Sequence, residues 1–179
     1  MITKREKVII ADVNENNFKD IPKMGKFDCQ ECMWFQKEKR SAERKENFLS
    51  ELSKNHGSCA KIIYIGGRPA GYCHYCPKKY LIRLEDYKRG SINTDAWFIA
   101  CLAVKKEYRS KGIALLMLKS VIKDLKERGI KKLQARGLTD GSGYNKGDNF
   151  PSGYWSIYEK LGFKEIGCVD NVKVGELTL

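Results

Sequence analysis

One junction constrains the fold of this 179-residue chain more than any other segment. Residues 97–104 read WFIACLAV, an apolar run without clean alternation, which predicts a central strand covered on both faces. A basic turn follows, and residues 111–128 then carry apolar side chains at helical spacing until Gly129 ends the pattern. The sequence therefore predicts a buried strand, a glycine-containing turn and an amphipathic helix in immediate succession.

The other segments alternate between strand and helix patterns. Gly66-Gly67 separates two strand patterns and is a two-residue hairpin signal. Residues 136–153, rich in Gly, Asp, Asn and Ser, predict a long loop, and such loops are usually functional or mobile. The predicted order is strand 8–11, short helix 14–20, helix 41–54, strands 61–65, 68–75 and 97–104, helix 111–128, strand 130–135, a helix from about Pro151 to Leu161, and a hairpin of 163–169 and 172–177.

The start of the helix after the apolar strand suits an anion. Its first N–H groups lack intrahelical partners, and the positive end of the helix dipole lies there. Gly112 lets an anion approach the backbone and Ala114 avoids a clash, although a glycine here also fits a turn that needs it for geometry alone. The chain has neither the glycine motif of dinucleotide-binding folds nor the P-loop motif, so neither of those nucleotide sites is supported.

Length and composition predict a single domain with a sizeable core, since 42% of the residues are apolar. The longest apolar runs, such as residues 96–104, are too short to cross a bilayer, and the N-terminus lacks the apolar stretch of a signal peptide. We therefore expect a cytoplasmic protein. The formal charge of +12 fits a solubilising lysine surface, or attraction to nucleic acid, an acidic peptide or the phosphates of a cofactor.

Three segments, in the same order, resemble the GNAT superfamily of N-acetyltransferases. The strand ends in Leu102-Ala103-Val104. The turn, Tyr108-Arg109-Ser110-Lys111-Gly112-Ile113-Ala114, is similar to the acetyl-CoA loop of the family, Gln/Arg-x-x-Gly-x-Gly/Ala. The third segment, Ile157-Tyr158-Glu159-Lys160-Leu161-Gly162-Phe163, is similar to the tyrosine-bearing helix of the family and the strand after it. The resemblance covers roughly residues 60–169.

The resemblance implies an α/β (α+β) fold, with a twisted, mixed, mostly antiparallel sheet and helices on both faces. Residues 1–179 then form one acetyltransferase domain, in which 60–169 are the acetyl-CoA-binding core and 1–58 the variable side that holds the acceptor. The implied reaction moves an acetyl group from acetyl-CoA, a co-substrate, to a primary amine by direct transfer in a ternary complex. The alternative is a non-catalytic protein that binds CoA, or nucleic acid on its basic surface.

The resemblance also implies the roles of particular residues. Backbone groups of Leu102, Ala103 and Val104 pair with the pantetheine arm as an added strand does, and the N–H of Leu102 faces the thioester oxygen. Tyr158 matches the tyrosine of the family that hydrogen-bonds the CoA sulfur and can protonate it. The pyrophosphate lies against backbone N–H groups from Arg109, Ser110, Lys111, Gly112, Ile113 and Ala114.

Two departures from the family pattern limit what is carried over. Pro151 and Tyr154 stand where many members have an asparagine and an alanine, so no asparagine contact is expected there. Many members also have a glutamate on the central strand as a general base, whereas residues 98–101 supply no carboxylate. We assign no base to this chain, neither Asp95 nor Glu31, and an amine of lowered pKa reacts without one.

The seven cysteines include two pairs at metal-like spacing, Cys29/Cys32 and Cys73/Cys76. Zinc binding, a regulatory disulfide and free thiols are all compatible with the spacing. Free thiols are the preferred interpretation and no metal is assigned, because residues three apart on a strand point to opposite faces.

Aromatic residues give the only candidates for acceptor contacts. Trp34 and Tyr72 are candidate substrate-binding residues, with ordinary core or hairpin packing as the alternative. The expected partner is a small-molecule or peptide amine; no membrane partner is expected, nucleic acid is a minor possibility from the charge, and a homodimer is compatible with the sequence.

Overall fold

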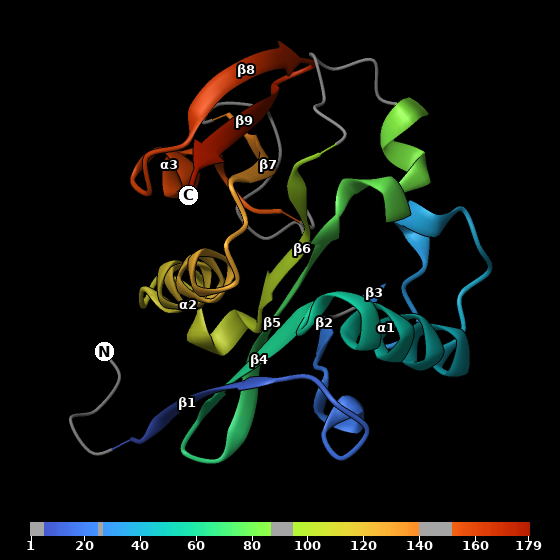
Figure 1. Cartoon of the computed structure of the whole chain (residues 1–179). Coiled ribbons are helices and arrows are strands. Elements are labelled where there is room, and N and C mark those ends of the chain that lie inside the picture. Colours follow the sequence, from blue (N-terminus) through green and yellow to red (C-terminus); the bar gives the residue numbers. More distant parts are fainter. Residues whose placement is uncertain (1–5, 25–26, 87–94, 140–151) are drawn as a thin grey trace.

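The computed structural model describes residues 6–24, 27–86, 95–139 and 152–179. Its main feature is a seven-stranded sheet in the order β1-β4-β5-β6-β7-β9-β8 (Figure 1). Every neighbouring pair is antiparallel except β6 and β7, as the sequence predicts for a mixed, mostly antiparallel sheet. The strands are β1 Val8–Asp12, β4 Ala60–Ile65, β5 Arg68–Pro77, β6 Trp97–Val104, β7 Lys132–Leu138, β8 Lys164–Val169 and β9 Val172–Thr178.

The single parallel pair is also the shortest pairing in the sheet. β6 and β7 are in register only at Trp97↔Leu133 and Phe98↔Gln134, and then the two strands part. On its other edge β6 stays paired with β5 from Trp97 to Val104, with a bulge opposite His74 and Tyr75. From Ile99 onward, the β7-facing edge of β6 therefore has no strand partner among the described residues.

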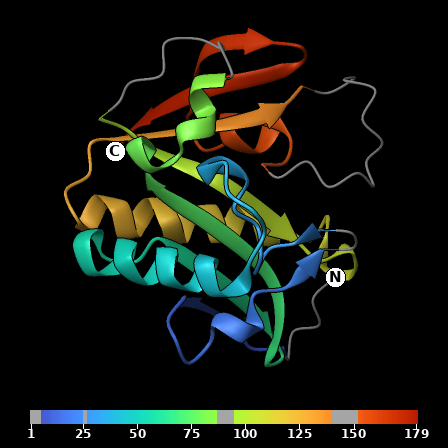
Figure 2. The ribbon, with the colours of Figure 1, turned by 90° about the vertical axis from the view of Figure 1, so that its right-hand side faces the viewer.

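Helices α1 (Ala42–His56) and α2 (Ile113–Glu127) cover opposite faces of the sheet, as predicted (Figures 1 and 2). Two consecutive residues of β5 make this clear. Nδ1 of His74 lies 3.2 Å from Nζ of Lys45 on α1, whereas the hydroxyl of Tyr75 donates to Asp124 on α2 at 3.0 Å. Successive side chains of a strand point to opposite faces, so the two helices lie on opposite sides.

Helix α1 packs on its face of the sheet through a short buried stripe. The side chain of Ser41 caps α1 by accepting from the backbone N–H of Arg44, and α1 buries Lys45, Leu49 and Leu52 against the sheet. Short elements lie between β1 and α1 and again before β6. They are the two-stranded sheet of β2 (Lys23–Met24) and β3 (Phe27–Asp28), and the 3-10 helices η1 (Phe18–Asp20), η2 (Trp34–Gln36), η3 (Lys78–Tyr80) and η4 (Ile82–Asp86).

Two glycines allow the short helix α3 (Trp155–Glu159) to lie directly on the sheet. A Cβ at Gly137 of β7 would come within 2.8 Å of the Trp155 backbone, and one at Gly175 of β9 within 2.2 Å of the Trp155 ring. These distances are shorter than any normal carbon–carbon contact. Because these two positions have no side chain, the sheet leaves room for Trp155. This determines how closely α3, and the Tyr158 that it carries, can approach the sheet.

The predicted strands and the two long helices are confirmed, with shifts at their ends. The helix predicted over 14–20 is wrong, because a turn precedes η1 and only residues 18–20 are helical. Strand β7 continues to Leu138, into the predicted loop, because it pairs with β9 over its full length. The last helix is shorter than predicted, with Tyr154 as its N-cap; Pro151 and the rest of the predicted loop, 140–150, lie outside the described residues.

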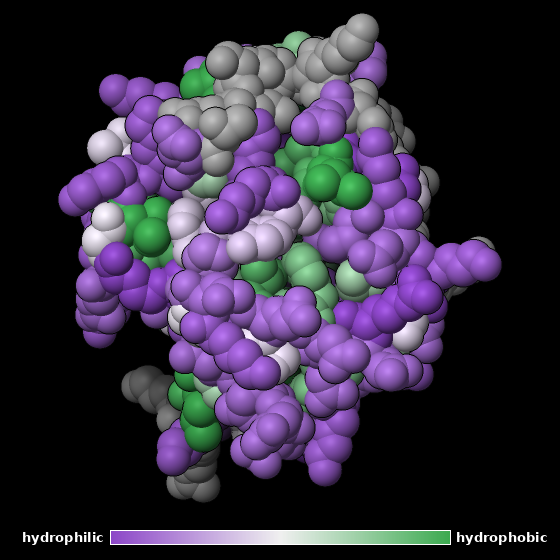
Figure 3. All heavy atoms as spheres, turned by 45° about the vertical axis from the view of Figure 1, so that its right-hand side comes forward, coloured by the Kyte–Doolittle hydropathy of each residue, from purple (hydrophilic) through white to green (hydrophobic). Residues whose placement is uncertain are grey.

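The surface is mostly polar. Figure 3 shows one face on which hydrophilic side chains predominate and apolar side chains gather only in small, separate patches. Among the described residues, Trp34 of η2 is the most exposed of the large apolar side chains, at 50%, and its ring stacks on the guanidinium of Arg83 at 4.1 Å. No helix in the described part of the chain is long and apolar enough to span a membrane.

The contact between Gly175 and Trp155 predicts an unusual stability effect. We expect Gly175→Ala to lower the free energy of unfolding by about 1–3 kcal/mol, because the new methyl group overlaps the indole ring. In a Trp155→Leu background the same substitution should lower the free energy of unfolding by clearly less, because the indole ring that the methyl group overlaps is absent. Denaturant unfolding of the four proteins in this double-mutant cycle measures the difference. Equal costs in both backgrounds would contradict the steric explanation.

Candidate functional site

The free edge of β6 is the first part of the candidate site. Leu102 is buried, while Ala103 and Val104 are partly exposed, so the strand emerges toward solvent at its end. The carbonyl of Val104 accepts a hydrogen bond from Nε of Arg109 at 2.9 Å, which ties the strand end to the turn that follows. The strand residues predicted to bind the cofactor thus lie on the part of β6 with which β7 does not pair.

The turn between β6 and α2 contains a 3-10 helix, η5 (Lys106–Tyr108), and then two residues in the left-handed region. Ser110 has φ 58° and Gly112 has φ 79°. Between them Nζ of Lys111 donates to the carbonyl of Glu107 at 2.7 Å, so the charged group of Lys111 is held on the turn itself. The chain therefore folds back tightly just before α2 begins.

The N-terminus of α2 fits an anion. Gly112 is the N-cap residue, and no side chain caps the helix there, so the first N–H groups of α2 have no side-chain acceptor. A Cβ built on Gly112 meets no atom within 4 Å, so the space beside this backbone is open. An oxygen-rich anion such as a pyrophosphate suits both features, because the helix dipole and unpaired N–H groups attract negative charge.

Tyr158 of α3 is fully buried and lies in the same core cluster as Ile99, Leu102 and Ile113 of the strand and turn. Its hydroxyl donates to the backbone carbonyl of Ser152 at 2.6 Å, and its ring packs edge-on against Phe163. Burial raises the pKa of the Tyr158 phenol well above its ordinary value, so it carries its proton at neutral pH. A protonated phenol at this place is a hydrogen-bond donor, and in this structure it donates to Ser152.

A match to the profile of a protein family identifies the family of this chain. The profile of the acetyltransferase (GNAT) family matches residues 26–163, most of the chain. This chain belongs to the GNAT family. Members of this family transfer an acyl group from acetyl-CoA, which they generally use as co-substrate. No curated protein sequence matches the chain significantly.

Solved structures show the same GNAT fold at low sequence identity. A GNAT-family acetyltransferase from Streptococcus pneumoniae aligns with a TM-score of 0.63 at 14% identity, over 97% of this chain and 99% of that one. An N-acetyltransferase from Staphylococcus aureus Mu50 gives 0.62 at 14% identity, over 96% and 98%. The ribosomal-protein-S18-alanine N-acetyltransferase of Escherichia coli gives 0.54 at 16% identity, over 96% and 94%.

The two aromatic residues predicted to contact the acceptor have different environments in this GNAT fold. Tyr72 is buried on the α1 face of β5, in a cluster with Cys29, and Cys101 and Ala103 of β6 pack against that cluster. The Tyr72 hydroxyl has no hydrogen-bond partner among the described residues. Trp34 lies at the surface on η2, so the structure does not bring the two residues together in one apolar pocket.

A buried polar group that the sequence did not reveal lies on the same face. Lys45 is only 3% exposed and His74 only 2%, and Nζ of Lys45 approaches Nδ1 of His74 to 3.2 Å. Burial lowers the pKa of Lys45, and burial together with the neighbouring Lys45 lowers the pKa of His74 well below its ordinary value. A signal was present: residues 45, 49 and 52 have the i, i+4, i+7 spacing of a buried helix face.

All seven cysteines are free thiols. A hydrogen bond with Cys101 lowers the pKa of the Cys29 thiol, with a smaller contribution from Lys45, whereas burial raises the pKa of Cys73 and Cys76. Across the described ranges, no three His, Cys, Asp or Glu side chains are arranged to hold a metal ion. The paired spacing in the sequence therefore corresponds to no assembled four-thiolate site.

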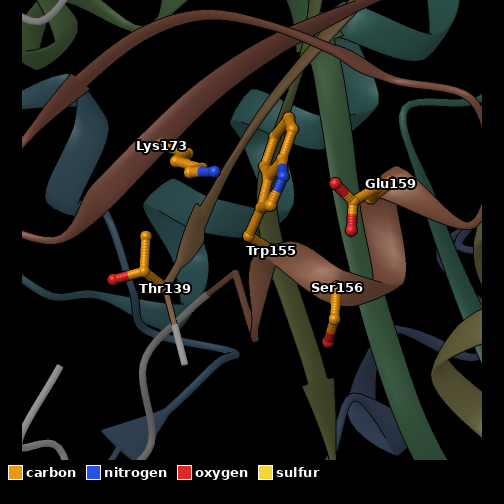
Figure 4. Close-up of a pocket in the computed structure, with 5 residues that line it drawn as sticks. All are labelled: Thr139, Trp155, Ser156, Glu159 and Lys173. Carbon is orange, nitrogen blue, oxygen red and sulfur yellow. The ribbon is translucent and has the colours of Figure 1, made fainter. Parts of the chain in front are cut away.

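A pocket of about 270 Å³ lies beside α3. Figure 4 shows Ser156 and Glu159 projecting from α3, with Trp155 between α3 and the Lys173 side chain; Thr139 completes the lining. None of the residues predicted to bind acetyl-CoA lines it. The pocket shows that one face of α3 is open while Tyr158 points into the core.

The open space at Gly112 predicts a selective loss of cofactor affinity. We expect Gly112→Val to raise the KM for acetyl-CoA at least tenfold, because the side chain fills the place where the anion would meet the backbone.

Gly129 provides a matched control at the other end of α2. It has φ 73°, and a Cβ placed on it also meets no atom within 4 Å, so Gly129→Val has the same backbone strain without the anion. Steady-state kinetics and thermal melting of both variants separate the effects. An equal rise in KM in the two variants would remove the turn from the cofactor site.

Proposed function

We propose that this chain is an N-acetyltransferase that moves the acetyl group of acetyl-CoA to a primary amine by direct transfer in a ternary complex. The observation that carries the proposal is the unpaired edge of β6 that leads, through the turn at Gly112, into the uncapped N-terminus of α2. Membership of the GNAT family supports assigning acetyl-CoA to this edge and turn.

Each part of the co-substrate has matching groups in the chain. Backbone groups of Leu102 and Val104 are suited to pair with the amides of the pantetheine arm, as one strand pairs with another. N–H groups from Arg109 to Ala114 are suited to the pyrophosphate. The N–H of Leu102, fixed in a strand and shielded from water, suits the thioester oxygen, where such a donor stabilises the charge that develops in the transition state.

The reaction then needs one proton removed and one supplied. The nitrogen of a neutral amine bonds to the acetyl carbon and loses a proton, while the carbon–sulfur bond breaks and the thiolate leaves. Tyr158 is the proposed donor to that sulfur, and its raised pKa supports this role because the phenol stays protonated. For this step its hydrogen bond must move from the Ser152 carbonyl to the sulfur, so the position of Ser152 affects catalysis.

The acceptor is proposed by class alone. The name of the Escherichia coli neighbour specifies an alanine of a ribosomal protein, which makes a protein amine one of the acceptors to test here. The formal charge of +12 opposes polyamines and favours amines that carry or adjoin negative charge. A cytoplasmic location and a homodimer remain predictions from the sequence.

A panel of amines tests the function. We expect release of free thiol from acetyl-CoA with at least one of four acceptors: a peptide with a free α-amino group, Nα-acetyl-lysine, an aminoglycoside and a diamine. Mass spectrometry should show one added acetyl group on the nitrogen. No turnover with any of them, together with RNA or DNA binding that weakens steeply with salt, would instead support a binding protein.

The proposed role of Tyr158 as proton donor to the CoA sulfur gives a second prediction. We expect Tyr158→Phe to lower kcat about 10²-fold, with the affinity for acetyl-CoA nearly unchanged, because the hydrogen bond strengthens only as charge builds on sulfur. It should also lower the melting temperature, because the Ser152 carbonyl loses its donor.

Tyr75→Phe is the matched control for that experiment. Tyr75 is equally buried, and its hydroxyl donates to Asp124 on the α2 face. We therefore expect a comparable stability loss with kcat within about twofold of the wild type, since this hydroxyl has no part in the proposed proton transfer. If both variants lose kcat to the same degree, Tyr158 is a packing residue.

A further inference from the structure

Two buried polar atoms on the α1 face of β5 have no hydrogen-bond partner in the described part of the chain. They are Nε2 of His74 and the hydroxyl of Tyr72, two residues apart on one strand and 2% and 1% exposed. Leaving such an atom unsatisfied costs about 1–3 kcal/mol. Two such atoms on the same face of one strand favour a place for a polar ligand over purely apolar packing.

These atoms lie next to the strand proposed to bind the thioester. His74 is in register with Cys101 and Tyr72 with Ala103, so the partners on β6 are the residues on either side of Leu102. Adjacent strands are about 4.8 Å apart, so the two residues lie one strand spacing from β6. They are therefore on the strand next to β6, at the level where the N–H of Leu102 is proposed to meet the thioester.

The other nitrogen of His74 is already engaged. Nδ1 lies 3.2 Å from Nζ of Lys45, and Nε2 is on the far side of the ring from this lysine. Phe48 of α1 packs edge-on against the imidazole with ring centroids 6.0 Å apart, and it fixes the ring orientation. His74 is thus held with one nitrogen on an amine and the other directed away from it.

Burial favours the neutral forms of both members of the pair, because it lowers the pKa of Lys45 and of His74. Four thiols lie near Lys45: Cys101 of β6, Cys76 of β5, and Cys29 and Cys32 of the segment after β3. When both members are neutral, the pair can take up one proton, and an amine is intrinsically more basic than an imidazole. A proton that enters at His74 therefore has Lys45 as its final position.

We propose that His74 and Lys45 form a proton relay that accepts the proton of the acceptor amine. This inference rests on the proposed acetyl transfer and supplies the general base that the sequence does not reveal. As the amine nitrogen bonds to the acetyl carbon, its proton passes to Nε2 of His74. The proton on Nδ1 passes to Nζ of Lys45, which becomes an ammonium and later returns that proton to solvent by the reverse path.

The relay requires one particular tautomer at rest. His74 must carry its proton on Nδ1, donating to a neutral Lys45, so that the lone pair of Nε2 is free. The chain has only one other histidine, His56, whose Nε2 lies 2.8 Å from the Tyr80 hydroxyl. Nitrogen-15 NMR of histidine-labelled protein in a His56→Phe background therefore reports His74 alone, and this measurement needs no acceptor.

The relay predicts a neutral His74 with Nδ1 protonated and Nε2 bare at pH 7. It also predicts that this signal persists below pH 6, because the lowered pKa delays protonation. A doubly protonated ring at pH 7, or a proton fixed on Nε2, would overturn the proposal whatever the enzyme acetylates.

Kinetics provide the second readout. With the best amine of the panel, we expect kcat to fall at least 10²-fold in His74→Phe and in Lys45→Met, and no further in the double variant, because the two residues act as one unit. The double variant also avoids a buried lysine without a partner. The dependence of kcat on pH should change as well. In the variants the fall of kcat on the acid side should begin at a higher pH, because only bases in the solvent remain to take the proton of the amine.

His56→Phe is the control, because it removes the other histidine from the opposite end of α1 and should leave the profile unchanged. Acetyl-CoA binding by titration calorimetry and thermal melting show that each variant is folded. Variants that bind acetyl-CoA and keep kcat within twofold across the pH range would overturn the relay alone. Failure of the wild type to acetylate any amine would instead count against the proposed function, while the NMR result would still decide the tautomer.

Discussion

The parting of β6 from β7 after Phe98 is the constraint on which the rest of the structure depends. A strand interior with one unpaired edge is costly, because its N–H and C=O groups need partners. The sheet tolerates the gap because β5 holds the other edge of β6 throughout and α2 anchors the strand end by covering the adjacent face. The groups proposed to bind acetyl-CoA in this GNAT domain lie along that edge and in the turn that follows it.

The sheet separates two tasks that the proposed reaction needs. On the α2 face lies the helix start that is proposed to hold the phosphates, and the Tyr75 hydroxyl donates to Asp124 there. On the α1 face lie the buried groups around Lys45 and His74, which are proposed to transfer a proton. The helix proposed to bind the anion and the proposed proton relay therefore lie on opposite faces of the sheet.

Sequence reasoning predicted the junction of β6 and α2 because a long apolar run and an amphipathic helix are strong local patterns. It missed the Lys45–His74 pair for a physical reason. Lys45 lies among charged residues in a helix that looks solvent-exposed, and the energetics of its burial depend on β5 and on thiols distant in sequence. The start of α3 was predicted too early, and the residue at which the helix begins, Trp155, lies against Gly137 and Gly175, contacts that local propensity does not reveal.

The alternation at His74 and Tyr75 has a consequence for how this chain can vary. Each residue serves a different face, so inserting or deleting one residue within β5 would exchange them and direct a phenol toward Lys45 and an imidazole toward Asp124. Both clusters would fail together, and the strand would also lose its alignment with Cys101. Length changes in this part of the protein are therefore best accommodated before Tyr72, at the turn of Gly66-Gly67 or at the bulge where Ala70 is left unpaired, while the segment around His74 and Tyr75 can vary only by substitution.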